Sequence, residues 1–600
     1  MIRLAACFAW AAVSLWAAST AAVIKSQHDL TATGTGTVRS AATDVCIFCH
    51  APHNVTNTIN VLWNQSLSTQ TYTTYASSTY SSGAETPSAG SSKLCLSCHD
   101  GTVAVGLTYA YGQIATTGSL TTQDVLGTNL NTSHPVSMTP KDDGGLASSL
   151  FANPASTKDP AVKLVAGKVE CTTCHDPHVQ NNDTAMQMFL VRSNANGALC
   201  LACHDPSRAQ PNPLNAWTTG SHNTSTTTPG VGSYTSVAAN GCSSCHLAHN
   251  NAAVPRNVRK AEEADCSPCH SSPALQNVMG DFAKTYAHPT TTISGAHDPA
   301  ESLPLNNTRH SECADCHNPH TVYAQTATVL PPTAQNSIAG TSGYDSTGPV
   351  VPAVNAYQVC YKCHADSSNK PYSATYNTYG RTATRYPSPL PAACTGTTPC
   401  PTQPPLPPDQ FNIRLKFTAT IGHNITGSFT QTIASPALLP YMLNVDNTTS
   451  NLNRPLTPTT ILYCSDCHNS NTARTSNGTG PSGPHGSTFR HLLERDLLQD
   501  SGSGQTGGGT GATLCGKCHN LTTVRGTSPH GDHNGYGCTS CHDPHGVIGG
   551  NPAANRAMMN YDTQVALKSG TYQGYAWIAS ANRGYCWTTC HGDNHNGRSY

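Results

Sequence analysis

The sequence predicts a mostly irregular chain with short helices and little β-structure, built around a repeated cysteine–histidine motif in place of a conventional apolar core. Three observations favour this fold class. The motif Cys-x-x-Cys-His occurs eleven times in 600 residues. Aromatic residues make up only 6% and charged residues 10% of the chain, whereas glycine (49) and proline (41) are abundant. The motifs recur about every 50 residues, too closely for separate domains that each bury their own core.

All eleven motifs have the same arrangement, with two cysteines three positions apart and a histidine directly after the second. In chain order they are Cys46, Cys49, His50; Cys95, Cys98, His99; Cys171, Cys174, His175; Cys200, Cys203, His204; Cys242, Cys245, His246; Cys266, Cys269, His270; Cys313, Cys316, His317; Cys360, Cys363, His364; Cys464, Cys467, His468; Cys515, Cys518, His519; and Cys538, Cys541, His542. A near-copy at Cys586, Cys590 and His591 has one extra residue between its cysteines. We number these motifs 1 to 12.

Cys-x-x-Cys-His is the attachment signature of c-type haem. The two thiols add to the vinyl groups of one porphyrin, and the adjacent histidine is the proximal ligand of its iron. Zinc sites and disulfides also use paired cysteines, but neither needs a histidine after every pair. Because histidine makes up only 29 of 600 residues, chance does not produce this pattern. The sequence therefore predicts about twelve covalently bound haem c groups, whose apolar faces replace the missing core.

Motif 12 could also form a local disulfide between its two cysteines. Its wider loop would have to bulge to attach both sulfurs to one porphyrin. Its cysteines and those of the other motifs account for 24 of the 27 in the chain, leaving Cys7, Cys394 and Cys400. We expect Cys394 and Cys400 to form a short disulfide loop, with free thiols as the alternative.

Each iron needs a second, distal ligand, and the seventeen histidines outside the motifs exceed the twelve required if every iron is bound by two histidines. Five lie three residues beyond a proximal histidine, where they cannot reach the opposite face of their own porphyrin but can reach a neighbouring one. These doublet histidines are His53, His178, His249, His320 and His545. Seven others stand alone before or between motifs: His28, His134, His222, His288, His423, His485 and His530. These twelve are the predicted distal ligands. The predicted surplus is His297, His310, His491, His533 and His595, with His310 and His533 as close rivals.

The chain divides into four predicted regions. Residues 1–21 combine Arg3, an apolar run and small residues at the end, as a secretory signal peptide does. Residues 22–385 form an eight-haem region and residues 411–600 a four-haem region, and the proline-rich segment 386–410 is a stiff linker between them. The signal peptide predicts export. No other stretch is long and apolar enough to span a membrane, so we expect a mature chain without a membrane span. Each motif should lie on one or two helical turns, and Ser487–Leu498 has the apolar spacing of a longer helix.

The chain resembles the bacterial multihaem c-type cytochromes with doubled Cys-x-x-Cys-His motifs, the extracellular and outer-surface electron-transfer cytochromes of metal-reducing bacteria. The resemblance covers nearly the whole mature chain and is most specific at Cys46–His53, Leu94–Ala104, Arg309–His320, Gly483–Ser487 and Cys586–His591. It implies closely stacked, low-potential haems, each bound by two histidines. Some relatives polymerise into extracellular filaments in which an N-terminal region ligates a haem of the next subunit, which makes His28 a candidate for that role.

We therefore expect electron transfer along stacked haems in or beyond the cell envelope and no enzymatic activity. The expected partners are other redox proteins, extracellular electron acceptors or further copies of the chain. The low charge and formal net charge of -1 argue against a nucleic-acid partner. Two alternatives stay open. One is a reductase of a small nitrogen or sulfur oxyanion with one open iron, and the other is a surface protein whose haems only stabilise the fold. Localisation at the outer surface or outside the cell is expected, with the periplasm as the alternative.

Overall fold

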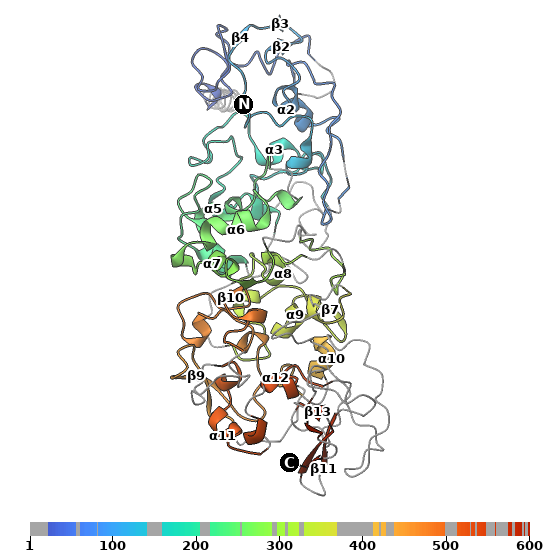
Figure 1. The fold of residues 1–600 in the computed structure, drawn as a ribbon. Coiled ribbons are helices and arrows are strands. Elements are labelled where there is room, and N and C mark those ends of the chain that lie inside the picture. The colour runs from blue at the N-terminus through green and yellow to red at the C-terminus, as the bar shows by residue number, and fades with distance from the viewer. Residues whose placement is uncertain are drawn as a thin grey trace, which may run out of the picture. The chain divides into compact units, whose positions relative to one another are not determined.

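The computed structural model describes a chain of short elements joined by long irregular segments (Figure 1). The described residues are 22–55, 61–80, 82–83, 85–140, 159–204, 217–251, 255–290, 297–306, 310–322, 329–368, 412–418, 422–427, 437–497, 513–528, 530–533, 537–547, 558–559 and five short strands between 574 and 599. The predicted signal peptide, the proline-rich linker, Cys394, Cys400, His591 and His595 lie outside them.

The described α-helices are four to nine residues long. They are α2 (Ser91–His99), α3 (Cys171–Cys174), α4 (Ser221–Thr224), α5 (Val237–Asn240), α6 (Glu262–His270), α7 (Val278–Phe282), α8 (Cys313–Cys316), α9 (Ala356–His364), α10 (Ile413–Thr418), α11 (Leu521–Arg525) and α12 (Cys538–Cys541). Within the described part of the chain, none is long and apolar enough to cross a membrane.

The strands are equally short and pair antiparallel in small sheets. They are β1 (Arg39–Ser40) with β4 (Thr116–Thr117), β2 (Leu107–Thr108) with β3 (Gly112–Gln113), β5 (Tyr286–Ala287) with β10 (Gly486–Ser487), β6 (Gly343–Asp345) with β7 (Gly348–Val350), β8 (Tyr441–Leu443) with β9 (Ser450–Pro455), β13 (Thr589–Cys590) with β14 (Asp593–Asn594), and the three-stranded sheet of β11 (Gly574–Ile578), β12 (Arg583–Trp587) and β15 (Arg598–Ser599). The predicted fold class, mostly coil with short helices and little β-structure, is confirmed.

The chain forms two compact units. The N-terminal unit contains residues 1–265, 298–300 and 319–323, and the C-terminal unit contains residues 266–297, 301–318 and 324–600. Helix α10 follows the predicted linker but packs on α9, which precedes it: Phe417 and Ile425 share an apolar cluster with Tyr361 and Ala365. This division therefore falls at a different place from the predicted one. The linker itself lies outside the described residues, so the predicted eight-haem and four-haem regions remain a prediction.

Among the residues that the structure describes, buried apolar side chains form small clusters. In the N-terminal unit, Tyr72, Leu96 and Leu130 make one cluster and Met138, Leu164 and Val169 another. Clusters of three or four buried side chains are small for a chain of this length. Such small clusters do not form a large core, so the array of motifs is the main feature around which the chain is organised.

The prediction of a helix over Ser487–Leu498 is wrong. Ser487 pairs in β10 with Tyr286 of β5, which holds the start of the segment in an extended conformation. The chain then makes a 3₁₀ turn at Arg490–Leu492 in which His491 and Leu492 have φ angles of 64° and 56°. These angles lie in the left-handed region, which ends a right-handed helix. The apolar spacing of this segment reflects a folded turn.

Candidate haem-binding site

Each of motifs 1 to 11 forms a tight helical turn, as predicted. In α2, α6 and α9 the motif closes a nine-residue helix, and elsewhere it occupies a single turn. The backbone N–H of the histidine donates to the carbonyl of the first cysteine, for example from His50 to Cys46 at 2.8 Å and from His519 to Cys515 at 3.0 Å. This turn places both thiols and the imidazole on one side of a short segment, as attachment to a single porphyrin requires.

Capping side chains hold several of these turns in place. Glu170 and Thr173 form a reciprocal capping box around α3, and Glu312 and Asp315 form one around α8. In both cases the residue before the first cysteine pairs with the residue before the second. A capping box satisfies N–H groups that the start of a helix leaves without partners. The motif is therefore stabilised by its own sequence and its immediate neighbour.

The proximal imidazoles are oriented by backbone carbonyls. The Nδ1 atom of His50 donates to Val61 at 2.8 Å, that of His99 to Asp124 at 2.7 Å and that of His175 to Met188 at 2.8 Å. His246, His317 and His468 make the same kind of bond at 3.1, 2.6 and 2.8 Å. A proton on Nδ1 leaves the lone pair of Nε2 for a metal and fixes the ring orientation.

Nine proximal histidines face a second imidazole. The pairs and the distances between their ring centroids are His50 with His178 at 6.2 Å, His99 with His28 at 6.2 Å, His175 with His249 at 6.0 Å, His204 with His134 at 6.4 Å, His246 with His320 at 6.0 Å, His317 with His485 at 6.0 Å, His364 with His288 at 6.5 Å, His468 with His545 at 6.0 Å, and His542 with His530 at 6.1 Å. Burial lowers the pKa of His519 to about 4, and the nearby charges of His423 and His542 lower it further, so His423 is the candidate second ligand of motif 10.

This spacing fits one metal ion between each pair. A metal–imidazole bond is about 2.0 Å long, and about 1.1 Å separates the ring nitrogen from the ring centroid, so two imidazoles in line on one ion have centroids about 6.2 Å apart. Imidazoles in direct stacking contact lie much closer. With two thiols beside each proximal histidine, the residues fit haem c whose iron is held by two histidines.

Two classes of pair alternate along the chain. In the odd-numbered motifs the imidazole planes are close to parallel, with angles from 8° for His468 and His545 to 34° for His175 and His249. In the even-numbered motifs 2, 4 and 8 the angles are 61°, 86° and 66°. Motifs 7 and 11 belong to the near-parallel class, with angles of 23° and 25°, although their second histidines, His485 and His530, stand alone in the sequence.

Motifs 1, 3, 5 and 9 take their second histidine from a motif further along the chain. His178 of motif 3 faces motif 1, His249 of motif 5 faces motif 3, His320 of motif 7 faces motif 5, and His545 of motif 11 faces motif 9. Each of these doublet histidines thus serves the motif two places earlier. No doublet histidine follows motif 9, and His485 beside it faces motif 7 instead.

Motifs 2, 4 and 8 take theirs from a solitary histidine. Hydrogen bonds join several solitary histidines to the residue just before another distal histidine. Four solitary imidazoles donate from Nδ1 to the carbonyl of a proline that directly precedes the other distal histidine: His28 to Pro177 at 3.0 Å, His222 to Pro319 at 2.8 Å, His288 to Pro484 at 2.5 Å and His423 to Pro544 at 2.8 Å. His134 makes the equivalent link through its backbone N–H, which donates to Ala248 before His249. The second ligands of motifs 1 and 2, 3 and 4, 7 and 8, and 9 and 10 are therefore held as linked pairs.

Burial keeps these imidazoles neutral near pH 7. It lowers the pKa of His249, His320, His485 and His545 to about 3, with smaller contributions from the charges of neighbouring histidines. Burial likewise lowers the pKa of His28 to about 4, against the opposing effect of the Pro177 carbonyl. A neutral imidazole is the form that ligates a metal.

Thiols connect successive pairs of motifs. The thiol of Cys171 lies close enough to that of Cys95 to raise its pKa, and Cys242 acts in the same way on Cys200 and Cys464 on Cys360. Each contact joins an even-numbered motif to the odd-numbered motif that follows it. Since these sulfurs are the points of porphyrin attachment, adjoining haem sites meet at their edges. Two kinds of junction thus alternate along the chain. Linked distal histidines join the two motifs of a motif pair, and adjoining thiols join one motif pair to the next.

Sequence reasoning missed two buried lysines inside the motifs. Lys362 of motif 8 donates to the carbonyl of Asp315 in motif 7. Lys517 of motif 10 donates to the carbonyl of Asp466 in motif 9 at 2.7 Å and to the carboxylate of Glu494 at 2.9 Å. The signal was the repeat of Cys-x-Asp-Cys followed by Cys-x-Lys-Cys, which marks motifs 7 to 10 as two copies of one arrangement.

Some predicted ligands remain without a described counterpart. His53 is exposed, and its ring faces no histidine within the described part of one chain. Cys586 and Cys590 lie in β12 and β13, unlike the helical turns of the other motifs, and His591 lies outside the described residues. The ligand roles of His53 and of motif 12 therefore stay predictions. Of the predicted surplus, His297 and His310 lie together beside Asp315.

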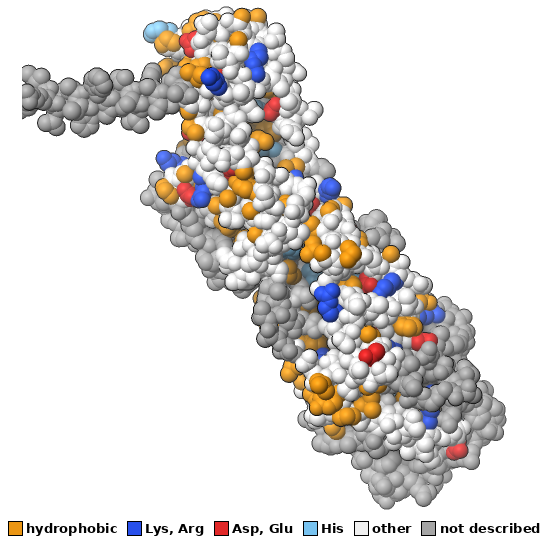
Figure 2. Space-filling model, turned by 90° about the vertical axis from the view of Figure 1, so that its left-hand side faces the viewer, with side chains coloured by type: hydrophobic (Ala, Val, Ile, Leu, Met, Phe, Trp, Pro, Cys, Tyr) orange, Lys and Arg blue, Asp and Glu red, His pale blue; other side chains and the backbone are white. Residues whose placement is uncertain are grey.

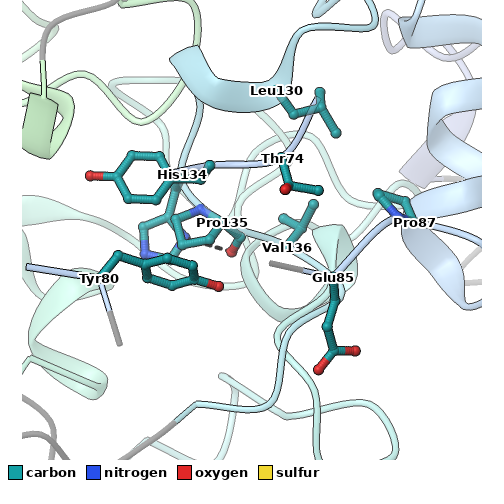
Figure 3. A pocket seen from close by; sticks show the side chains of 9 residues that line it. Thr74, Tyr80, Glu85, Pro87, Leu130, His134, Pro135 and Val136 are labelled. Carbon is teal, nitrogen blue, oxygen red and sulfur yellow. Dashed lines mark hydrogen bonds between the residues drawn. The ribbon is translucent and has the colours of Figure 1, made fainter. Parts of the chain in front are cut away.

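A small hollow in the N-terminal unit lies beside His134 (Figure 3). Tyr80, Glu85, Leu130 and Pro135 are among its lining residues, and its volume is about 10 Å³. Such a volume holds about one water molecule and is far below that of a typical ligand pocket. The hollow therefore offers no room for a substrate.

Comparison with known families agrees with this geometry. The family model described as a doubled CXXCH motif matches residues 163–209, which contain motifs 3 and 4. No curated protein matches the chain significantly. The matched segment contains the proximal histidines His175 and His204 and the two cysteines that precede each of them. The motifs indicate covalently bound haem c, and they support a multihaem c-type cytochrome that transfers electrons.

Proposed function

We propose that this protein is an exported dodecahaem cytochrome that conducts electrons along haems that are each held by two histidines. Bound haem c supplies a one-electron couple at its iron. The observation that carries the proposal is the alternation of junctions. Linked distal histidines join the two motifs of a pair, and adjoining thiols such as Cys95 and Cys171 join one pair to the next. Close and regular junctions are what a conduit needs, whereas haems that only stabilise a fold have no need to adjoin.

The role of the protein residues is orientation and insulation. Nδ1–carbonyl bonds hold the imidazoles in fixed orientations, so changes of iron charge cause little movement. Burial of the ligands excludes water from the metal and keeps the imidazoles neutral. A catalytic reductase needs an iron with one open face, and the supply of paired histidines argues against one in motifs 1 to 5 and 7 to 11.

The surface is consistent with a protein outside the cytoplasm. On the face drawn in Figure 2 few side chains are charged, and they lie among apolar side chains, uncharged polar groups and backbone. We propose export through the N-terminal segment 1–21 and a place at the outer surface or outside the cell. Other redox proteins or extracellular acceptors are the proposed partners. Because the chain has few charged residues, we expect these partners to bind without strong electrostatic steering.

The ligand pattern also favours association between copies of the chain. Doublet histidines serve the motif two places earlier, whereas His53 of motif 1 is exposed and its ring faces no histidine within the described residues. His28, the residue singled out by the family resemblance, already faces His99 at 6.2 Å. We therefore propose His53 as the histidine that ligates a haem of a neighbouring copy in a head-to-tail polymer.

The first test is low-temperature EPR of the oxidised protein together with its haem stoichiometry. Twelve haems per chain, all low-spin, support the conduit. A stoichiometric high-spin signal would instead favour the reductase. Stopped-flow reduction then distinguishes a conduit, in which all haems are reduced in one fast phase, from isolated haems that are reduced in scattered slow phases.

The polymer is tested separately with His53→Ala. We expect the variant to keep its haem content but to lose assembly in light scattering and electron microscopy. His533→Ala, which alters a histidine outside the ring pairs, is the control and should assemble like the wild type. Unchanged assembly of the His53 variant would contradict the proposed role of this residue while leaving electron transfer within one chain intact.

A further inference from the structure

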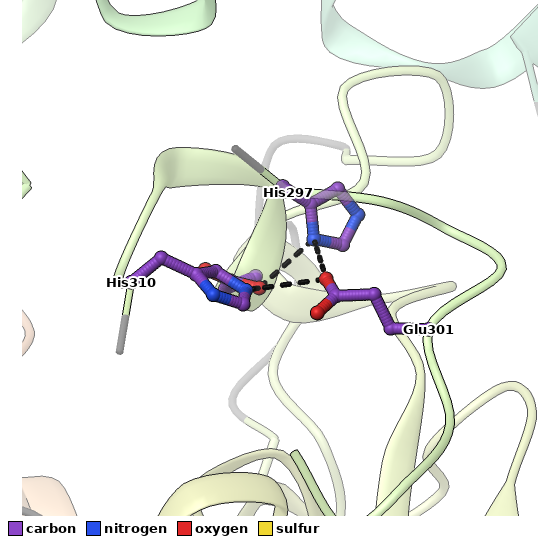
Figure 4. Close-up of side chains that lie close together, drawn as sticks. His297, Glu301 and His310 are labelled. Atoms are coloured by element: carbon purple, nitrogen blue, oxygen red, sulfur yellow. Dashed lines mark hydrogen bonds and ion pairs between the residues drawn. The ribbon is translucent and has the colours of Figure 1, made fainter. Parts of the chain in front are cut away.

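Four potential metal ligands converge in the C-terminal unit at a place that the haem sites do not use. His297, Glu301, His310 and Asp315 each direct one ligand atom toward a common point, and these atoms all lie within 4.8 Å of one another. Figure 4 shows the imidazoles of His297 and His310 turned toward the carboxylate of Glu301. Their side chains are 13%, 5% and 6% exposed, and that of Asp315 is 6% exposed. Two imidazoles and two carboxylates are thus enclosed together.

The spacing of these atoms matches ligands on one ion. Nδ1 of His297 lies 2.9 Å from Oδ1 of Asp315 and 3.7 Å from Oε1 of Glu301. Nε2 of His310 lies 3.2 Å from Oε1 of Glu301 and 3.5 Å from Oδ1 of Asp315. Bonds of about 2.0–2.2 Å in tetrahedral geometry place neighbouring ligand atoms about 3.4 Å apart. The four distances scatter around this value, so an ion fits between the ligands with shifts of a few tenths of an ångström.

These histidines are not needed by the haem beside them. His317 of motif 7 faces His485, and His364 of motif 8 faces His288. Both irons therefore have two histidines without His297 or His310. The imidazoles of this cluster face the carboxylates of Glu301 and Asp315, whereas each proposed haem site joins two imidazoles. Two imidazoles with two carboxylates are a ligand set for a divalent ion.

Neighbouring groups orient the cluster. The backbone N–H of His297 donates to the carboxylate of Glu312, and that of Glu312 donates to Oδ2 of Asp315 at 2.7 Å. The second bond leaves Oδ1 of Asp315 directed at the two imidazoles. Lys362 donates to the backbone carbonyl of Asp315, so its cation lies near but does not occupy the position between the ligands. Outer-shell bonds of this kind are typical of metal sites.

We propose that His297, Glu301, His310 and Asp315 form a structural site for a divalent transition-metal ion of the zinc type. Nitrogen ligands favour such an ion over magnesium or calcium, which prefer oxygen alone. Four protein ligands close the coordination sphere, as in structural zinc sites. The ion would join the segments that precede α8 to α8 itself. Because Asp315 lies between Cys313 and Cys316, the ion would also hold the attachment turn of motif 7.

The alternative is a site without a metal ion, in which both imidazoles are protonated and form ion pairs with the carboxylates. The two are distinguished with the intact haem protein, treated with a chelator and then equilibrated with zinc chloride. We expect one zinc per chain by mass spectrometry of the elements. The zinc K-edge absorption spectrum, which haem iron does not affect, should show two imidazoles and two oxygen ligands at about 2.0–2.2 Å.

Glu301→Gln and His310→Gln should each lower zinc affinity by at least about ten-fold. Glu85→Gln and His533→Gln are the matched controls and should bind zinc like the wild type. The haem spectrum of each variant reports whether it has folded. The zinc K-edge spectrum is recorded on the wild-type protein, so it tests the site even if a variant does not fold. Absence of zinc uptake, a spectrum without two imidazoles, or full affinity in both ligand variants would overturn the site and favour the proton-bound pairs.

Discussion

The imidazole of His28 donates a hydrogen bond from Nδ1 to the carbonyl oxygen of Pro177, 3.0 Å away, and Pro177 directly precedes His178. His28 faces the proximal histidine of motif 2, and His178 faces that of motif 1. The second ligands of two adjoining haem sites are therefore held by one hydrogen bond. The same relationship recurs at Pro319, Pro484 and Pro544, so the basic unit of this fold is a pair of motifs.

Replacing a linked histidine should open one haem. In His28→Ala, motif 2 loses the imidazole opposite His99, and we expect one high-spin haem per chain in the EPR spectrum of the oxidised protein. Loss of the bond to Pro177 should also broaden the low-spin signal of motif 1, because His178 is less firmly held. An unchanged spectrum would show that His28 is not a ligand.

The two classes of ligand geometry should be visible in the same kind of spectrum. The angle between two axial imidazole planes controls the anisotropy of low-spin ferric haem. We expect ordinary rhombic signals from odd-numbered motifs, such as the pair of His246 and His320 at 9°, and strongly anisotropic signals from even-numbered motifs, such as the pair of His204 and His134 at 86°. A single homogeneous low-spin signal would contradict this alternation.

Buried Glu170 should be important for stability. Only 3% exposed, it accepts hydrogen bonds from the backbone N–H of Ser92 at 3.1 Å and from the hydroxyls of Ser92 and Ser137. Glu170→Ala leaves these buried donors without their acceptor, and we expect a loss of about 1–3 kcal/mol in the free energy of unfolding.

The matched control for that variant is Glu85→Ala. Glu85 pairs with Lys168, but their side chains are 35% and 41% exposed, so its loss should cost less than about 1 kcal/mol. Denaturant titration of both variants, followed by circular dichroism, measures the difference. Equal losses in the two variants would show that burial of the Glu170 network does not matter.

Acid should destabilise the protein below neutral pH. Burial lowers the pKa of His249, His320, His485 and His545 to about 3 in the folded protein, against an ordinary value of 6.5. Between these values the unfolded chain binds more protons than the folded one. Stability is therefore complete above pH 6.5 and falls as the pH decreases toward about 3, by up to roughly 1.4 kcal/mol per pH unit for each histidine.

Denaturant titrations at pH 7, 5.5 and 4, with the visible spectrum recorded at each, measure this dependence. We expect high-spin bands to grow as distal imidazoles become protonated. A free energy of unfolding that is constant from pH 7 to pH 4 would contradict neutral, buried ligands.

The sequence by itself determined the local chemistry. The eleven motifs, their turns and the sparse regular structure follow from residues that are close in the chain, because a Cys-x-x-Cys-His segment closes its own hydrogen bond from histidine to the first cysteine. The predicted helix at Ser487–Leu498 failed because the pairing of Ser487 with Tyr286, 201 positions earlier, overrides local periodicity. Local patterns carry no information about such a partner.

Only the tertiary structure decided which histidines meet. His53 and His178 occupy the same place after their motifs, yet His178 faces His50, which lies 128 positions earlier, while His53 faces no histidine within the described part of the chain. Likewise, His297 and His310 are ordinary loop residues in the sequence and become part of a four-ligand cluster only when Glu301 and Asp315 fold against them. Contacts between distant segments depend on packing of the whole chain, and that packing is what assigns each imidazole its partner.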